Sequence, residues 1–222
     1  MALTVTLLGG ESSGKTSLAQ ALHRHLNDGL QVHSTLVTEH LRDWCQIRGR
    51  APLAHEQVDR AEAQTRAIQQ AAADEAVQVV IADTTAMVIA AYSELYFYDR
   101  TLWPDAIDHQ RRYDLCLLMG LDLPWVPDGL FRDGPALREA TDTLLRRELQ
   151  AASIPFRTLY GSLDSRMQQA LRTIGPLLDR SLVDEDPHWA RGRRPWTCDQ
   201  CSDPDCEHRL FSQLLQQRTR EA

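Results

Sequence analysis

The chain has 222 residues, 43% of them hydrophobic and 25% charged, a balance typical of a globular protein rather than a disordered or collagen-like chain. The formal net charge of −7 argues against broad nucleic-acid binding, and the most apolar stretch, residues 77–92, is too short and too polar to span a membrane. Five cysteines, an odd number, and the lack of a secretory leader indicate a cytoplasmic protein whose thiols are reduced or bind metal.

The first predicted strand, residues 3–8, leads into a glycine-rich loop and then into a helix over residues 17–26. The loop, residues 9–16, reads Gly-Gly-Glu-Ser-Ser-Gly-Lys-Thr and matches the P-loop pattern G-x-x-x-x-G-K-[ST] at every fixed position. In such a loop, backbone N–H groups surround phosphate oxygens, Lys15 reaches the β- and γ-phosphates, and the Thr16 hydroxyl binds Mg²⁺. The sequence therefore predicts an ATP site, with GTP as the alternative. The residues expected to contact the nucleotide are Gly10, Glu11, Ser12, Ser13, Gly14, Lys15, Thr16 and Ser17.

The composition singles out the same loop. Lys15 is the one lysine among 24 basic residues, and arginine is used everywhere else. A compact ammonium rather than a planar guanidinium is therefore required at this position. The alternative, a chance glycine turn before a helix, does not account for the lysine.

A second strand is predicted over residues 31–38, followed by Glu39 and Arg42, and a long helix over residues 54–76. The next strand, residues 77–82, is apolar throughout much of its length and ends at Asp83, as in a strand buried on both faces of a parallel sheet. An aspartate at this end of the strand would bind Mg²⁺ or accept the proton of an attacking hydroxyl. Its alternative role is to cap the helix that begins near Thr85, and both roles can hold together.

After a strand over residues 112–119, the segment 121–138 is rich in Pro, Gly and Asp, and is typical of a lid that closes over a nucleotide. Its arginines, Arg132 and Arg138, would neutralise charge on the transferred phosphoryl group. Alternatively the segment is a solvated connector whose arginines pair with its own aspartates. Those aspartates are Asp122, Asp128 and Asp133.

The remaining elements are a helix over residues 134–152, a strand over 154–160 and a helix over 163–178. The predicted fold is therefore α/β, a P-loop NTPase with a parallel sheet of about five strands flanked by helices. We place a domain boundary near residue 180, which separates the domain 1–180 from a small Cys-rich appendage, 181–222.

Several motifs together resemble one family. The phosphate loop, Glu39-x-x-Arg42, Asp83-Thr84, Tyr113-Asp-Leu and Pro124-Trp-Val-x-Asp-Gly-Leu resemble the nicotinamide riboside kinase family, the kinase part of the bacterial NAD-salvage regulator and a branch of AAA-type P-loop proteins. The similarity runs from about residue 3 to 175. Two departures lie on the substrate side. Asp83-Thr84-Thr85 lacks a second carboxylate, and Gly129-Leu-Phe-Arg132 is one residue longer than the usual Gly-Leu-Arg. The regulator's adenylyltransferase and DNA-binding parts are not expected in a chain that begins at the first strand of the kinase.

The resemblance implies ATP- and Mg²⁺-dependent phosphorylation of nicotinamide riboside to its mononucleotide, in NAD biosynthesis. Lys15, Asp83, Glu39 and Arg132 are the expected catalytic residues, and Arg138 would contact the nucleotide. Glu39 would bind ribose hydroxyls or share the role of base, and Trp125 would stack on the pyridinium ring or anchor the lid. The expected substrate contacts are Glu39, Arg42, Asp83, Trp125 and Asp128.

The alternatives are a kinase for another nucleoside or small metabolite, and an NTPase switch that acts on a protein partner. The oligomeric state stays open.

The appendage contains Cys198-x-x-Cys201-x4-Cys206-x-His208, three cysteines and a histidine within eleven residues. Two cysteines at this first spacing form half of a structural Zn²⁺ site, and Cys206 with His208 would complete a tetrahedron. Cys45 or Cys116 could replace His208. The alternative is a set of reduced thiols in a loop.

Overall fold

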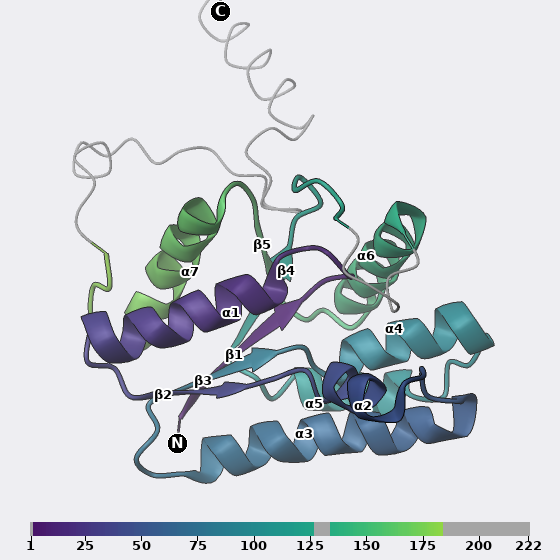
Figure 1. Cartoon of the computed structure of the whole chain (residues 1–222). Coiled ribbons are helices and arrows are strands. Elements are labelled where there is room, and N and C mark those ends of the chain that lie inside the picture. Colours follow the sequence, from purple (N-terminus) through teal and green to yellow (C-terminus); the bar gives the residue numbers. More distant parts are fainter. Residues whose placement is uncertain (1, 127–133, 184–222) are drawn as a thin grey trace, which may run out of the picture.

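A five-stranded parallel sheet forms the centre of the computed structural model, which describes residues 2–126 and 134–183 (Figure 1). The strand order is β2-β3-β1-β4-β5, and all four pairings are parallel, so the carboxyl ends of the strands share one edge. The strands are β1 (Leu3–Leu8), β2 (Ser34–Val37), β3 (Val79–Asp83), β4 (Leu115–Met119) and β5 (Arg157–Leu159).

Helices cover both faces of this sheet, with α1 and α7 on one face and α3, α4 and α5 on the other (Figure 1). They are α1 (Lys15–Arg24), α2 (His40–Arg48), α3 (Gln57–Ala73), α4 (Ala86–Phe97), α5 (Trp103–Gln110), α6 (Pro135–Ala151) and α7 (Leu163–Leu177). Two short elements add to them, a π-helical turn His25–Gly29 and a 3₁₀ turn Ala54–Glu56. The predicted P-loop fold is confirmed.

Strand β1 shows why helices cover both faces of the sheet. Val5 and Leu7 point into a core shared with α1 and α7, whereas Leu8 points into the opposite core with α4 and α6. All three side chains are fully buried. Because successive side chains of a strand face opposite sides, an apolar strand of this kind requires helices on both faces.

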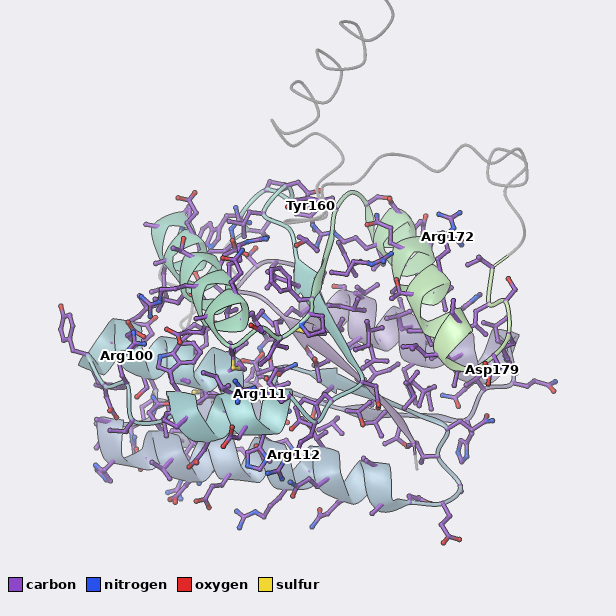
Figure 2. All side chains as sticks on the ribbon, turned by 180° about the vertical axis from the view of Figure 1, so that it is seen from behind. Arg100, Arg111, Arg112, Tyr160, Arg172 and Asp179 are labelled. Atoms are coloured by element: carbon purple, nitrogen blue, oxygen red, sulfur yellow. The ribbon has the colours of Figure 1, made fainter. Side chains whose placement is uncertain are left out.

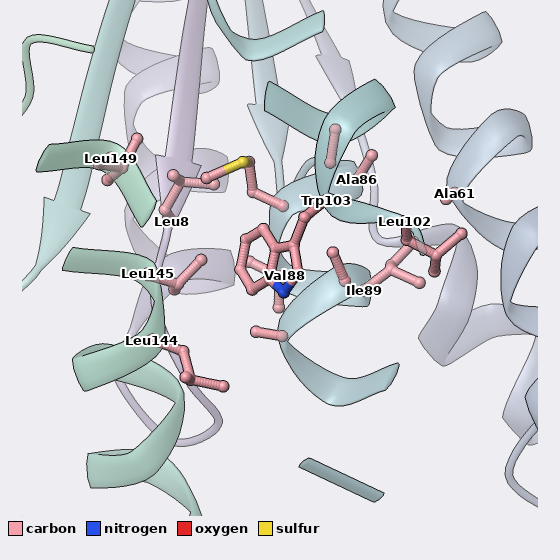
Figure 3. Close-up of a cluster of buried hydrophobic side chains, with 14 of the residues drawn as sticks. Leu8, Ala61, Ala86, Val88, Ile89, Leu102, Trp103, Leu144, Leu145 and Leu149 are labelled. Atoms are coloured by element: carbon pink, nitrogen blue, oxygen red, sulfur yellow. The ribbon is translucent and has the colours of Figure 1, made fainter. Parts of the chain in front are cut away.

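The second core is built around α4, which is buried from Ala86 to Ala91, and around Trp103 of α5 (Figure 3). The Trp103 ring packs among apolar side chains, and its Nε1 donates a hydrogen bond to Glu94 at 2.7 Å. Glu94 also pairs with Arg100, labelled in Figure 2, and with Arg147 of α6. One carboxylate therefore joins α4, α5 and α6.

The ends of several elements differ from the prediction, each for a local reason. The strand predicted over 31–38 begins at Ser34, because the Val32 N–H bonds the Leu26 carbonyl at 2.8 Å and closes a turn. The helix predicted to reach residue 76 ends at Ala73, where the Asp74 carboxylate accepts the Ala76 N–H at 2.9 Å. Among the described residues, no helix is both long and apolar enough to cross a bilayer.

Candidate active site

The phosphate loop runs from the tip of β1 to the start of α1 (Figure 1). Gly14, with φ of 84°, takes the left-handed conformation that glycine adopts without strain, and it precedes Lys15 at the first position of α1. Two side chains close the loop on the Gly10 carbonyl, which accepts from Ser13 Oγ at 2.7 Å and from Lys15 Nζ at 2.9 Å. Lys15 is thus buried and held across the loop.

Arg166 of α7 bonds the backbone of this loop, a role that sequence analysis missed. Its guanidinium donates to the Ser13 carbonyl at 2.6 Å, to the Gly120 carbonyl at 3.1 Å and to Asp122 at 2.6 Å. The side chain is only 1% exposed, so it ties the phosphate loop to the chain that leaves β4. The signal in the sequence is an arginine on the buried, apolar stripe of an amphipathic helix. In the part of the chain that the structure describes, Asp122 pairs with this arginine.

Glu11 fixes the segment after β4 to the phosphate loop. Its Oε1 accepts hydrogen bonds from Trp125 Nε1 at 3.1 Å and from the Gly134 N–H at 2.9 Å. The Val126 N–H bonds Ser12 Oγ at 2.8 Å. Trp125 therefore lies against the phosphate loop with its ring nitrogen on a carboxylate. Two further predicted residues, Asp128 and Arg132, lie outside the described part of the chain.

Arg138, predicted to contact the nucleotide, bonds the backbone of the segment that follows β4. It is buried, and its Nη1 donates to the Leu123 carbonyl at 2.8 Å, on the segment that carries Trp125. Its backbone also passes close to Gly10, where an added Cβ would stand 3.0 Å from the Arg138 carbonyl oxygen. A side chain at position 10 of the phosphate loop would therefore press on the backbone of α6, which packs directly on it.

The ends of β2 and β3 bring the predicted acidic residues to the same edge as the phosphate loop. Arg42 of α2 lies between Thr16 and Glu39. Its Nη1 donates to Thr16 Oγ1 at 3.2 Å, and its Nη2 lies 3.2 Å from Glu39 Oε2 as an ion pair without a hydrogen bond. The hydroxyl expected to bind Mg²⁺ and the carboxylate expected to act on the acceptor are thus joined by one guanidinium.

The electrostatics of Glu39 suit a proton acceptor. Burial raises the pKa of Glu39 above its ordinary value, the Asp83 carboxylate adds to the rise, and Lys15 and Arg42 oppose it. A carboxylate with a raised pKa binds a proton more strongly than an exposed glutamate does. Burial raises the pKa of the Tyr92 phenol on α4, and the charges of Glu39 and Glu11 raise it further. Tyr92 therefore lies near the same carboxylates.

Asp83 is the last residue of β3 and pairs in register with Leu7 of β1, next to the phosphate loop. The side chain is 2% exposed, and its Oδ1 has no hydrogen-bond partner in the described structure. Thr85 caps α4 by accepting the Met87 N–H at 3.3 Å, so the capping role considered for Asp83 is wrong. A buried carboxylate oxygen without a partner fits a bound cation or a substrate hydroxyl. With the Thr16 hydroxyl it offers the oxygen ligands that Mg²⁺ prefers.

A second residue missed from the sequence, Gln64 of α3, lies between these strand ends. It is fully buried and makes three hydrogen bonds to the backbone, at Thr38, His40 and Thr84. The signal was again a polar residue on a buried helix stripe, here the one formed by Ala61, Gln64, Thr65 and Ile68.

The predicted zinc ligands Cys198, Cys201, Cys206 and His208 lie outside the described residues, and so does the appendage beyond residue 183. The two cysteines named as possible substitutes are in the core. Burial raises the pKa of Cys45, and that of Cys116 to about 12, which opposes the thiolate that a metal needs. Within residues 2–126 and 134–183, no cluster of three or more His, Cys, Asp or Glu side chains is placed to bind a metal.

Comparisons with solved structures show a shared fold. Two structures of NadR protein, one in complex with NR and one with NAD and AMP-PNP, match with TM-scores of 0.66 and 0.64 at 22% and 20% identity. Each match covers 83% of this chain and 53% or 52% of the other, so the chain spans about half the length of NadR. Deoxyadenosine kinase from M. mycoides matches with a TM-score of 0.54 at 12% identity, over 78% of this chain and 100% of that one.

Comparisons of sequence place the chain in a family. No curated protein matches it significantly. The model of a family described as "AAA domain" matches residues 4–166, which begin in β1 and end at the arginine that supports the phosphate loop. Since this match covers most of the chain and contains the phosphate loop, the protein belongs to this AAA-domain family of P-loop proteins.

Proposed function

We propose that the protein is a kinase that transfers the γ-phosphoryl group of ATP to a hydroxyl of a small nucleoside-like molecule. The observation that carries this proposal is the placement of Asp83 and Glu39, two buried carboxylates, at the strand ends beside a complete phosphate loop. Asp83 would serve the bound nucleotide by holding Mg²⁺, which leaves Glu39 to act on an acceptor. Phosphoryl transfer to an alcohol requires both a cradle for the triphosphate and a group that receives the acceptor's proton.

Each residue has a defined part in this transfer. Lys15 and the N–H groups of the phosphate loop hold the β- and γ-phosphates in line with the acceptor hydroxyl. Thr16 and Asp83 would hold Mg²⁺, which would supply positive charge that stabilises the transferred phosphoryl group. Arg42 contacts the Thr16 hydroxyl and the Glu39 carboxylate and holds these two side chains together.

Glu39 accepts the proton. The acceptor oxygen attacks the γ-phosphorus, the bond to the β-bridging oxygen breaks, ADP leaves, and the hydroxyl proton passes to Glu39. The raised pKa of Glu39 supports this assignment, because a stronger base takes the proton more readily at neutral pH. Binding of ribose hydroxyls by the same carboxylate is compatible with that role.

Nicotinamide riboside is the acceptor we propose. The motif around Trp125 resembles that of the nicotinamide riboside kinase family, and a NadR structure of the same fold contains NR. The Trp125 indole, held by Glu11, offers the pyridinium ring a stacking surface.

A screen of ADP release tests the proposal. The protein is incubated with MgATP and nicotinamide riboside, adenosine, cytidine, uridine, thiamine or no acceptor, with Lys15→Met as the control for contaminating ATPases. We expect ADP release that depends on nicotinamide riboside and is absent from the control. Release with another acceptor alone would identify a different nucleoside or metabolite kinase. Turnover without any acceptor that responds to a protein partner would instead support an NTPase switch.

A further inference from the structure

The side chain of Gln64 links the two strand ends that carry the site carboxylates. Its Nε2 donates to the Thr38 carbonyl at 3.2 Å and to the Thr84 carbonyl at 3.1 Å, and its Oε1 accepts the His40 N–H at 3.0 Å. Thr38 and His40 flank Glu39 in the sequence, and Thr84 follows Asp83. The Gln64 amide therefore bonds the backbone on both sides of Glu39 and the backbone of Thr84, which follows Asp83.

The backbone at Thr84 needs such a restraint. Thr84 has φ of 93°, in a region that β-branched residues rarely adopt, and its side chain is fully buried with Oγ1 unpartnered in the described structure. A strained residue persists only where its surroundings hold it. Here its N–H bonds the Leu7 carbonyl at 3.2 Å, and its carbonyl accepts from Gln64. The conformation of Thr84 sets the direction in which the chain leaves β3, directly after Asp83.

We propose that Gln64 is a positioning residue, which fixes Glu39 and Asp83 relative to each other so that one acts on the acceptor and the other on the metal-bound phosphate. The inference rests on the proposed function. Both amide hydrogens and the oxygen of Gln64 are used, and an apolar residue of equal size would leave three backbone groups unpaired. The three bonds end on the site backbone rather than on the sheet that α3 covers, which favours positioning over a general role in packing.

The first test compares Gln64→Met with Thr65→Val. Methionine keeps the volume of Gln64 and removes its three hydrogen bonds. The control lies on the same helix, is also buried, and loses a hydrogen bond to Tyr113, which precedes β4 at the opposite edge of the sheet. We expect kcat of Gln64→Met to fall about 10- to 100-fold, as when supporting partners of catalytic groups are removed, with the KM for MgATP changed less than about 2-fold. Thr65→Val should keep the wild-type kcat. A wild-type kcat in a folded Gln64→Met would overturn the proposal.

A double-mutant cycle separates positioning from general destabilisation. If Gln64 acts through Glu39, then Gln64→Met in a Glu39→Gln background should lower kcat by less than about 3-fold. An equal loss in both backgrounds would mean that Gln64 acts independently of Glu39, and the proposal fails. If Gln64→Met does not fold, Gln64→Glu replaces it, since glutamate keeps an acceptor for the His40 N–H and loses both donors.

Amide hydrogen exchange tests the inference apart from the proposed function. In Gln64→Met the amides around Thr38–His40 and at Thr84 should both exchange faster, and in Thr65→Val neither should. If the wild type phosphorylates no acceptor but this pattern is found, the proposed function fails and the linkage of the two strand ends stands. If only one segment loosens, or neither does, the linkage is wrong whatever the activity.

Discussion

Lys15 crosses the phosphate loop and donates to the Gly10 carbonyl, the position from which an ammonium turns to a bound triphosphate. We expect Lys15→Met to fold and to transfer phosphate at least about 100-fold more slowly, as for other losses of a positioned charge in a transition state. Lys15→Arg is the matched variant, and it should recover little activity because a planar guanidinium does not fit the enclosed site. Steady-state kinetics measures both variants. An unchanged rate in folded Lys15→Met would remove the phosphate loop from the mechanism.

Asp83 has a carboxylate oxygen with no hydrogen-bond partner among the described residues. Asp83→Asn keeps the shape and removes the charge. We expect kcat to fall more than the KM for the acceptor rises, because a metal ligand or base acts mainly in the transition state. Kinetics at saturating MgATP separates the two effects. Full kcat in this variant would leave Asp83 without a part in the chemistry.

At the residue scale, what sequence could predict depended on the distance between partners along the chain. The phosphate loop is contiguous, so its glycines, Lys15 and Thr16 were readable directly. Arg166 lies 153 residues from Ser13, whose carbonyl it binds, and Gln64 lies 20 residues or more from its partners on both strands. Such contacts can be predicted only once the order of the strands in the sheet is known. In both cases the readable sign was a long polar side chain on the buried face of a helix.

At the scale of elements, every predicted strand and helix within the described residues is present, because long apolar runs and helical periodicity survive packing. The ends were less accurate. The strand predicted from Arg112 begins at Leu115, since the Arg112 and Tyr113 N–H groups bond His109 and Gln110 and extend the turn after α5. Backbone bonds of this kind depend on neighbouring turns that residue type alone does not reveal.

The helices α4, α5 and α6 meet at Glu94, and this junction gives a prediction of stability. Arg100 and Arg147 donate to its carboxylate at 2.7 and 3.1 Å. Burial raises the pKa of Glu94, but hydrogen bonds from Arg147 and Trp103 outweigh it and leave the pKa below its ordinary value. We expect Glu94→Gln to cost about 1 kcal/mol, which lowers Tm by about 2–4 °C at pH 7.

The pH dependence of that cost has a defined sign. Because the folded pKa of Glu94 lies below 4.5, its stabilisation is complete above pH 4.5 and is lost as the pH falls through the folded pKa. The Tm difference between wild type and Glu94→Gln should therefore narrow below about pH 4.5. Arg111→Gln loses an exposed pair with Asp108 and an exposed hydrogen bond to the Ala152 carbonyl at 3.3 Å. It should change Tm little, with no dependence on pH near 4.5, and serves as the control (Figure 2). A Tm difference that is constant with pH would contradict this account of the junction.

At the scale of the whole molecule, three strand ends contribute to one candidate site. The phosphate loop follows β1, Glu39 follows β2, and Asp83 ends β3. Their meeting follows from parallel topology, since all strands end at one edge. The sequence could therefore predict where the site lies. It could not predict the support from α3 and α7, which depends on how those helices pack against the edge.

The appendage carries a separate prediction, that Cys198, Cys201, Cys206 and His208 bind one structural Zn²⁺. Four protein ligands close the coordination sphere, and the proposed chemistry already uses Mg²⁺. A chelator should therefore loosen the region around residues 195–210 and leave kinase activity in place, because metal binding in such sites drives local folding. Elemental analysis of protein purified without a metal-affinity tag measures the zinc. Less than about one-tenth of an equivalent would mean that these are reduced thiols.

The most direct test of the whole account follows the phosphoryl group itself. Protein is mixed with [γ-³²P]ATP, Mg²⁺ and nicotinamide riboside, and labelled nucleotide is separated from labelled inorganic phosphate. We predict that the label appears in the 5′-monophosphate of nicotinamide riboside with wild type, and that Lys15→Met and Asp83→Asn each transfer it at least about 100-fold more slowly. Label found only in inorganic phosphate, at a rate that no nucleoside changes, would contradict the claim that this edge of the sheet transfers phosphate to an acceptor.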